Sequence, residues 1–141
     1  MKLLWSSNYP GAPTGYGSQT AQVVGRIKAA GHDIAVAANY GLAGREDVWN
    51  GVPIYPQSYD AYGNDVIPAH FVDWLDGQPG WLITLFDVWP FERTRFADLP
   101  VVSWTPVDHL PAPPKVVEWC REHRTIAMSR FGQEALAGQD V

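Results

Sequence analysis

A strand, a helix and a second strand follow one another at the start of the chain, and this order limits the possible folds most. Residues 2–6 form a short apolar run, and a polar loop rich in Pro and Gly follows at residues 7–14. Apolar residues then recur at helical spacing over 16–30, and Gly31 stands where a left-handed helix C-cap belongs. Residues 34–38 form a second apolar run. These segments predict a βαβ unit with a right-handed crossover.

The same alternation continues to the end of the chain. A loop is expected at 40–51. Further strands are expected at 52–55, 81–86, 101–104 and 125–128, and further helices at 65–75, from 113 onward and at 130–137. With 141 residues, the chain has the length of one domain. The prediction is an α/β fold: one Rossmann-like domain over 1–141, doubly wound around a mostly parallel sheet of six strands, with an α+β arrangement as the less favoured alternative.

Composition excludes several classes of function. The formal net charge of -5 provides no basic surface for a nucleic acid backbone. The single cysteine cannot form an internal disulfide, and the apolar start is too short for a signal peptide, so a cytoplasmic location is expected. No apolar run reaches the ~20 residues of a transmembrane helix. No Cys, His, Asp or Glu spacing predicts a metal site.

The loop after the first strand is the first candidate binding segment. Gly15, Tyr16 and Gly17 stand where a helix begins, and glycines there permit close approach of a phosphate to unpaired N–H groups. A connection that binds nothing is the alternative. A dinucleotide fingerprint would need glycine where Thr20 stands and an acidic residue where Asn39 stands, which counts against an NAD-dependent oxidoreductase.

Two later strand ends carry further polar candidates. Asp87, followed by Trp89, is placed to hold a substrate hydroxyl or, alternatively, to cap the next turn. Asp108 and His109 follow the next strand, where a carboxylate beside an imidazole can orient a sugar hydroxyl or remain solvated. A set of five aromatic residues is expected either to stack on a sugar or base or to pack in the core or in loops: Tyr9, Tyr16, Trp89, Phe91 and Trp104.

Three segments in this order resemble one enzyme family. They are the Gly-rich turn after the first strand, the stretch Gly31-His32-Asp33-Ile34-Ala35-Val36, and Ser129-Arg130-Phe131-Gly132 at the start of the last helix. Together they resemble the N-terminal half of a GT-B glycosyltransferase of the family-4 type, and the resemblance covers the whole chain.

The resemblance implies a retaining transfer of a sugar from a nucleotide-sugar donor to a sugar, lipid or other acceptor, without a metal or other cofactor. It implies that Gly15, Tyr16 and Gly17 approach the donor pyrophosphate. It assigns the residues nearest the transferred sugar to Asp108 and His109. The acceptor side is implied to include Tyr9, Asp87 and Trp89.

The chain also departs from the family pattern. The family's donor-binding half carries two glutamates eight positions apart, and no pair among the glutamates here has that spacing: 46, 92, 118, 122 and 134. The chain is therefore expected to be an isolated N-terminal domain without the C-terminal donor-binding domain, inactive by itself. A non-catalytic Rossmann-like binding module is the alternative function.

Overall fold

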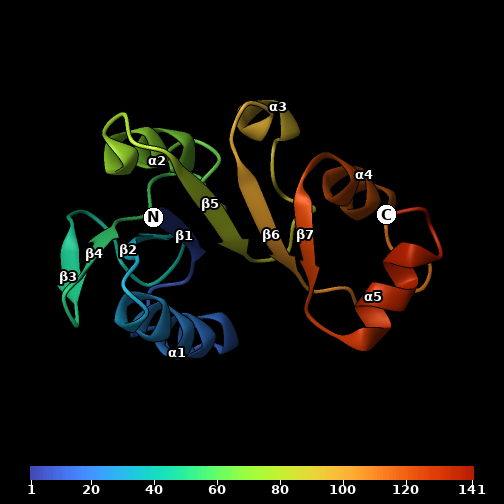
Figure 1. The fold of residues 1–141 in the computed structure, drawn as a ribbon, viewed down its shortest axis with the longest axis horizontal. Coiled ribbons are helices and arrows are strands. Elements are labelled where there is room, and N and C mark those ends of the chain that lie inside the picture. Colours follow the sequence, from blue (N-terminus) through green and yellow to red (C-terminus); the bar gives the residue numbers. More distant parts are fainter.

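A mostly parallel sheet of seven strands, with helices packed against it, makes up the fold (Figure 1). The computed structural model describes all residues from 1 to 141. The elements along the chain are β1 (Lys2–Ser7), α1 (Gly15–Ala29), β2 (Asp33–Ala38), β3 (Asp47–Trp49), β4 (Val52–Tyr55), α2 (Ile67–Leu75), β5 (Gly80–Leu85), α3 (Arg93–Phe96), β6 (Val101–Thr105), α4 (Pro114–Glu122), β7 (Arg124–Ala127) and α5 (Arg130–Ala137).

The strand order places β1 in the interior of the sheet. The order is β3-β4-β2-β1-β5-β6-β7, and every neighbouring pair is parallel except β3 with β4. From β1 the chain builds outward in one direction through β2 and β4, and then returns to β5 on the other side of β1. Ligands of open parallel sheets bind beside the carboxyl ends of the strands where the order reverses, which is here between β1 and β5.

The expected count of six strands is one short. The segment 40–51, expected to be a loop, contains β3, which pairs antiparallel with β4 through Asp47 and Ile54, Val48 and Pro53, and Trp49 and Val52. A strand of three residues is too short to show an alternating pattern, so its pairing with β4 is visible only in the folded chain.

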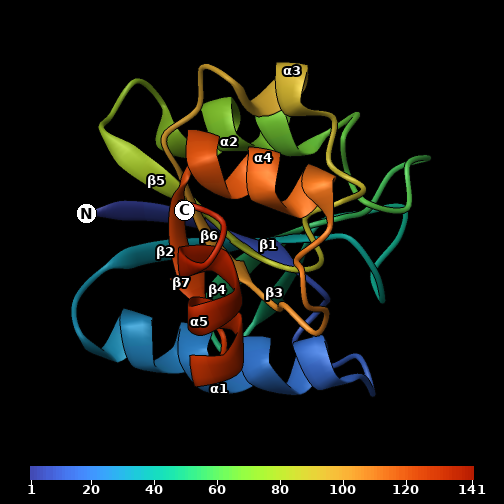
Figure 2. The same cartoon turned by 90° about the vertical axis from the view of Figure 1, so that its right-hand side faces the viewer.

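The two faces of the sheet bury separate apolar clusters. On one face, α1 packs Val24 against Leu3, Trp5 and the apolar residues of β2. On the opposite face, α2, α3 and α4 cover Leu4, Leu82 and Val101 (Figures 1 and 2). Strands buried on both faces read as continuous apolar runs, which is the pattern that the sequence shows.

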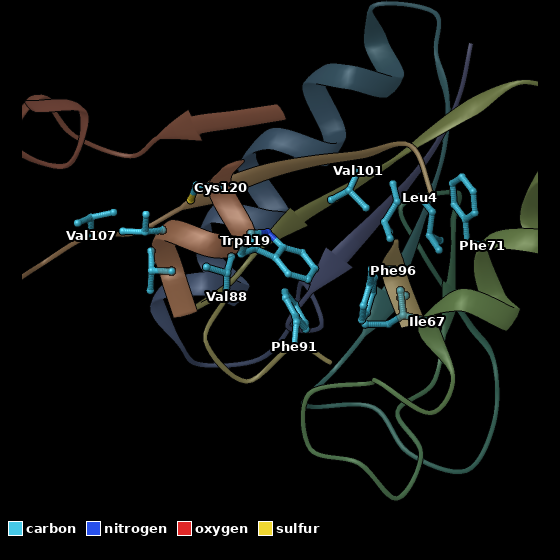
Figure 3. Close-up of a cluster of buried hydrophobic side chains, with 14 of the residues drawn as sticks. Leu4, Ile67, Phe71, Val88, Phe91, Phe96, Val101, Val107, Trp119 and Cys120 are labelled. Atoms are coloured by element: carbon cyan, nitrogen blue, oxygen red, sulfur yellow. The ribbon is translucent and has the colours of Figure 1, made fainter. Parts of the chain in front are cut away.

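An aromatic group dominates the larger cluster (Figure 3). The Phe91 ring lies 5.1 Å from Phe96 and 5.0 Å from Trp119 between ring centroids. The indole N–H of Trp119 donates to Ser103 Oγ at 3.0 Å, so the one polar atom of this large side chain is satisfied inside the core.

Most helix boundaries agree with the sequence expectations within two residues. Gly31 adopts the expected positive φ of 86°, and the Ser129 hydroxyl caps α5 by accepting from Gly132 N at 3.0 Å. The short helix α3 was not expected, because four residues carry no periodic pattern. None of the helices combines the length and the apolarity that a membrane span requires.

Candidate functional site

Two loops at the carboxyl edge of the sheet enclose a small pocket. One loop follows β5 and the other follows β6, and they bound a cavity of about 190 Å³. The residues that line it are Asp87, Val88, Trp89, Pro106, Val107, Asp108, His109, Pro113 and Val116. Four residues expected at the site from the sequence, Asp87, Trp89, Asp108 and His109, therefore line one cavity, because parallel neighbouring strands bring their carboxyl ends to the same edge.

The first turn of α1 reaches the same region through Tyr16. Its hydroxyl donates to Asp87 Oδ2 at 3.1 Å, joining residues that lie 71 positions apart in the sequence. Burial raises the pKa of Tyr16 well above its ordinary value, and the negative charges of Asp87 and Asp108 raise it further. The phenol therefore stays protonated and acts as a hydrogen-bond donor, and both carboxylates lie near enough to influence it.

Asp108 and His109 form an exposed pair at the rim. His109 Nδ1 lies 2.6 Å from Asp108 Oδ1, and this hydrogen bond is the main cause of a lowered pKa for the Asp108 carboxyl. An ionised carboxylate can only accept, so Nδ1 carries the proton in this bond and Nε2 is left to form a hydrogen bond with a ligand. The arrangement suits a group that orients a hydroxyl or responds to developing charge.

Aromatic rings form a wall beside the pocket. Phe86 lies 5.1 Å from Tyr16 and 5.9 Å from Tyr62, and Tyr62 lies 6.0 Å from Trp89, measured between ring centroids. Trp89 remains half exposed, at 51%. Sequence reasoning missed Tyr62, which precedes α2 in an irregular loop, and it assigned Phe86 to a strand. Two of the aromatic residues expected to stack on a ligand, Tyr16 and Trp89, thus belong to one contiguous group of rings.

Asn64 is a second residue that the sequence did not identify. It is buried, and its side-chain amide donates to Asp60 Oδ2 at 2.9 Å and to Pro90 O at 3.2 Å. Its carbonyl accepts from Glu92 N at 2.9 Å. These bonds fasten the loop that carries Tyr62 to the loop that carries Trp89. No pattern in the sequence marks an isolated Asn in a loop as such a link.

The two glycines at the start of α1 serve different purposes. A Cβ at Gly17 would lie 2.4 Å from Ala12 O and 3.0 Å from Tyr9 O, so the protein's own loop fills the space there. The Gly17 N–H donates to the Thr14 hydroxyl at 2.9 Å, which caps the helix. Gly15 has open space within 4 Å of its Cβ position and no positive φ, so a turn that demands glycine is not the reason for its presence.

Tyr9 does not line the pocket. Its hydroxyl donates to Asp47 Oδ2 at 3.0 Å, and this hydrogen bond is the main cause of its raised pKa. The ring packs against the cluster on the α1 face instead. The pocket therefore gathers Asp87, Trp89, Asp108 and His109, with Tyr16 bonded to its edge, whereas Tyr9 contacts β3.

No group of three or more His, Cys, Asp or Glu side chains converges in a way that would hold a metal ion. No known protein-family model matches the chain, and neither a curated protein nor a solved structure matches it significantly.

Proposed function

We propose that this chain is the acceptor-side domain of a retaining glycosyltransferase with the GT-B architecture, similar to family 4. In this proposal the sheet is one doubly wound half of the enzyme, and a second, donor-binding domain completes the active site. The complete enzyme transfers a sugar from a nucleotide-sugar donor to a hydroxyl of an acceptor. The cytoplasm is the proposed location, because the single cysteine, Cys120, leaves the chain without an internal disulfide, as is usual in a reducing compartment.

The convergence at the carboxyl edge carries this proposal. The helix start at Gly15 and Tyr16, the Asp87 carboxylate and the Asp108–His109 pair come from three strand ends, and they lie where open parallel sheets bind ligands. A helix start with unpaired N–H groups suits a pyrophosphate, and carboxylates beside aromatic rings suit a sugar.

Each group has a role in the proposed reaction. Asp87 accepts a hydrogen bond from an acceptor hydroxyl and orients it, while Tyr16 fixes the carboxylate in place. Asp108 and His109 lie closest to the transferred sugar and stabilise positive charge as the bond to the nucleotide breaks. Gly15 and Tyr16 approach the departing pyrophosphate.

The proposal predicts weak donor binding by these 141 residues alone. The chain has no glutamate pair with the spacing typical of the family's donor half, so most donor contacts are expected elsewhere. Calorimetry with UDP-, GDP- and ADP-sugars should show nothing tighter than about millimolar, roughly -4 kcal/mol. Micromolar binding by the isolated chain would contradict the half-site assignment.

A transfer assay tests the activity itself. The chain joined to a donor-binding domain should release nucleotide diphosphate from at least one nucleotide sugar, in proportion to the acceptor supplied. If the assembled protein binds sugars through the pocket but never transfers them, the chain is a non-catalytic binding module instead.

A further inference from the structure

The pocket between the loops after β5 and β6 combines negative charge with aromatic surface. Its lining includes two carboxylates, Asp87 and Asp108, and the indole of Trp89. No Lys or Arg belongs to the lining, and the one ionisable nitrogen base is His109. The pocket therefore presents a negative potential to whatever enters it.

Neither carboxylate has a Lys or Arg partner in the lining. Asp87 Oδ2 accepts from the neutral Tyr16 phenol, and Asp108 is bonded to the neighbouring imidazole. Among exposed cations, Arg93 and Lys115 border a separate hollow that also touches Trp89. Arg93 is already paired with Glu118 and Glu122 on α4, so it is not available to the pocket.

The aromatic rings beside the pocket also favour a positively charged ligand. Trp89 is half exposed, and its ring lies 6.0 Å from Tyr62, so an indole surface remains open to a ligand. Aromatic faces attract cations through their quadrupole, and they also stack on the apolar faces of sugars. An ammonium group near this surface would gain both the aromatic contact and the two carboxylates.

We infer that the acceptor is a hydroxylated amine, such as an amino sugar, whose ammonium group binds between Asp87, Asp108 and the Trp89 ring. This inference rests on the proposed function, because it takes the pocket to be the acceptor site. Phosphorylated or carboxylated acceptors are disfavoured, since they would meet two carboxylates and no Lys or Arg side chain in the lining. The small volume of about 190 Å³ suits a single sugar ring rather than an extended chain.

The test compares ligands that differ in charge but not in ring size. Glucosamine, N-acetylglucosamine, glucose and glucose 6-phosphate are titrated into the isotopically labelled chain, and the Trp89 indole N–H is followed by NMR. Glucosamine should shift this signal and bind about tenfold more tightly than N-acetylglucosamine, because only its amine carries charge. Glucose 6-phosphate should leave the signal unchanged.

Variants that remove one negative charge test whether binding depends on the pocket carboxylates or on the net charge of the protein. Asp87→Asn and Asp108→Asn should each weaken glucosamine binding about tenfold. Asp33→Asn is the matched control, because it removes the same charge at the exposed amino end of β2, at the opposite edge of the sheet. The control should bind glucosamine as the unaltered chain does, and the amide spectra of all three variants should report an intact fold.

Three results of the binding experiment overturn the inference. They are equal binding of glucosamine and N-acetylglucosamine, a response of Trp89 to glucose 6-phosphate, and the absence of any Trp89 shift with high millimolar glucosamine. None of these results bears on whether a nucleotide sugar is used, so the transfer assay judges the proposed function separately. An enzyme that transfers only to neutral acceptors would refute the inference and keep the function.

Discussion

At the scale of single residues, the two glycines at the start of α1 differ in the space around their Cβ positions. Gly17 lies against the carbonyls of Ala12 and Tyr9, and no side chain fits there. Gly15, two positions earlier, has free space around its Cβ position. The absent side chain at Gly17 therefore makes room for the protein's own loop.

Alanine substitutions should separate these two glycines. Gly17→Ala should lower the free energy of unfolding by roughly 1–3 kcal/mol, because its methyl group would force the loop away from the helix. Gly15→Ala should leave it unchanged or raise it by up to about 1 kcal/mol, since alanine favours the helix. Urea unfolding followed by circular dichroism measures both. Equal changes in the free energy of unfolding for the two variants would contradict the close contact between Gly17 and the preceding loop.

Under the proposed function, the Asp108–His109 pair should matter for catalysis when the chain is joined to a donor-binding domain. Asp108→Asn keeps the shape and removes the charge, so kcat should fall by about 10²-fold with a smaller effect on KM. His109→Ala tests the other member of the pair. The substitution with the larger loss of kcat identifies the side chain that lies nearer the reacting sugar. Steady-state kinetics with intact circular dichroism spectra are the measurement. Turnover near that of the unaltered protein in both variants would remove this loop from the chemistry.

At the scale of elements, the end of α4 contains a histidine that is built in as a neutral group. His123 follows the last residue of α4, its ring lies 4.3 Å from that of Trp119, and its Nε2 is buried without a hydrogen-bond partner. Burial lowers its pKa below the ordinary value of 6.5, and the nearby Arg93 lowers it too, while Glu122 acts in the opposite direction. Protonation of His123 therefore opposes the folded state.

This arrangement predicts a loss of stability in mild acid. With a pKa lowered in the folded state, the unfolded chain binds the proton more tightly, so the contribution is fully present above pH 6.5 and is lost as the pH falls through the folded-state pKa. His123→Phe keeps an aromatic ring beside Trp119 and cannot titrate. Urea unfolding at several pH values should show a shallower decline below about pH 6.5 for the variant than for the unaltered chain. If the free energy of unfolding falls equally with pH in both proteins, His123 does not contribute to the pH dependence of stability.

At the scale of the whole molecule, a buried hydroxyl network connects elements that are distant in sequence. Ser103 Oγ on β6 lies 3.0 Å from Thr84 Oγ1 on β5 and 2.9 Å from Thr105 Oγ1. It also accepts from Trp119 on α4 at 3.0 Å. One small side chain thus satisfies polar atoms from two strands and a helix, all within the core.

Ser103→Ala should destabilise the entire fold. The change leaves the Trp119 N–H and two hydroxyls short of a partner in the core, which should cost roughly 1–3 kcal/mol of unfolding free energy. Trp119→Phe removes the indole donor, so the double variant should lose less than the sum of the single losses. Urea unfolding of the four proteins measures this coupling. Strictly additive losses would indicate that the network does not act as a unit.

The sequence by itself determined the kinds of elements and most of their limits. Apolar runs marked the strands that are buried on both faces, and local signals such as Gly31 and Ser129 marked helix ends. These features depend on a few neighbouring residues, so periodicity and capping chemistry suffice to find them. The positions of Asp87 and of Asp108 with His109 at strand ends followed from the same reasoning, as did their placement at one edge of a parallel sheet.

Only the tertiary structure decided which side chains meet. The hydrogen bond from Tyr16 to Asp87, the link through Asn64 and the ring of Tyr62 beside Trp89 depend on strand order and on the path of irregular loops. The pairing of β3 with β4 and the hydrogen bond from Tyr9 to Asp47 also depend on strand order and loop path. Contacts between residues distant in sequence follow from packing of the whole chain, and no local pattern encodes their partners.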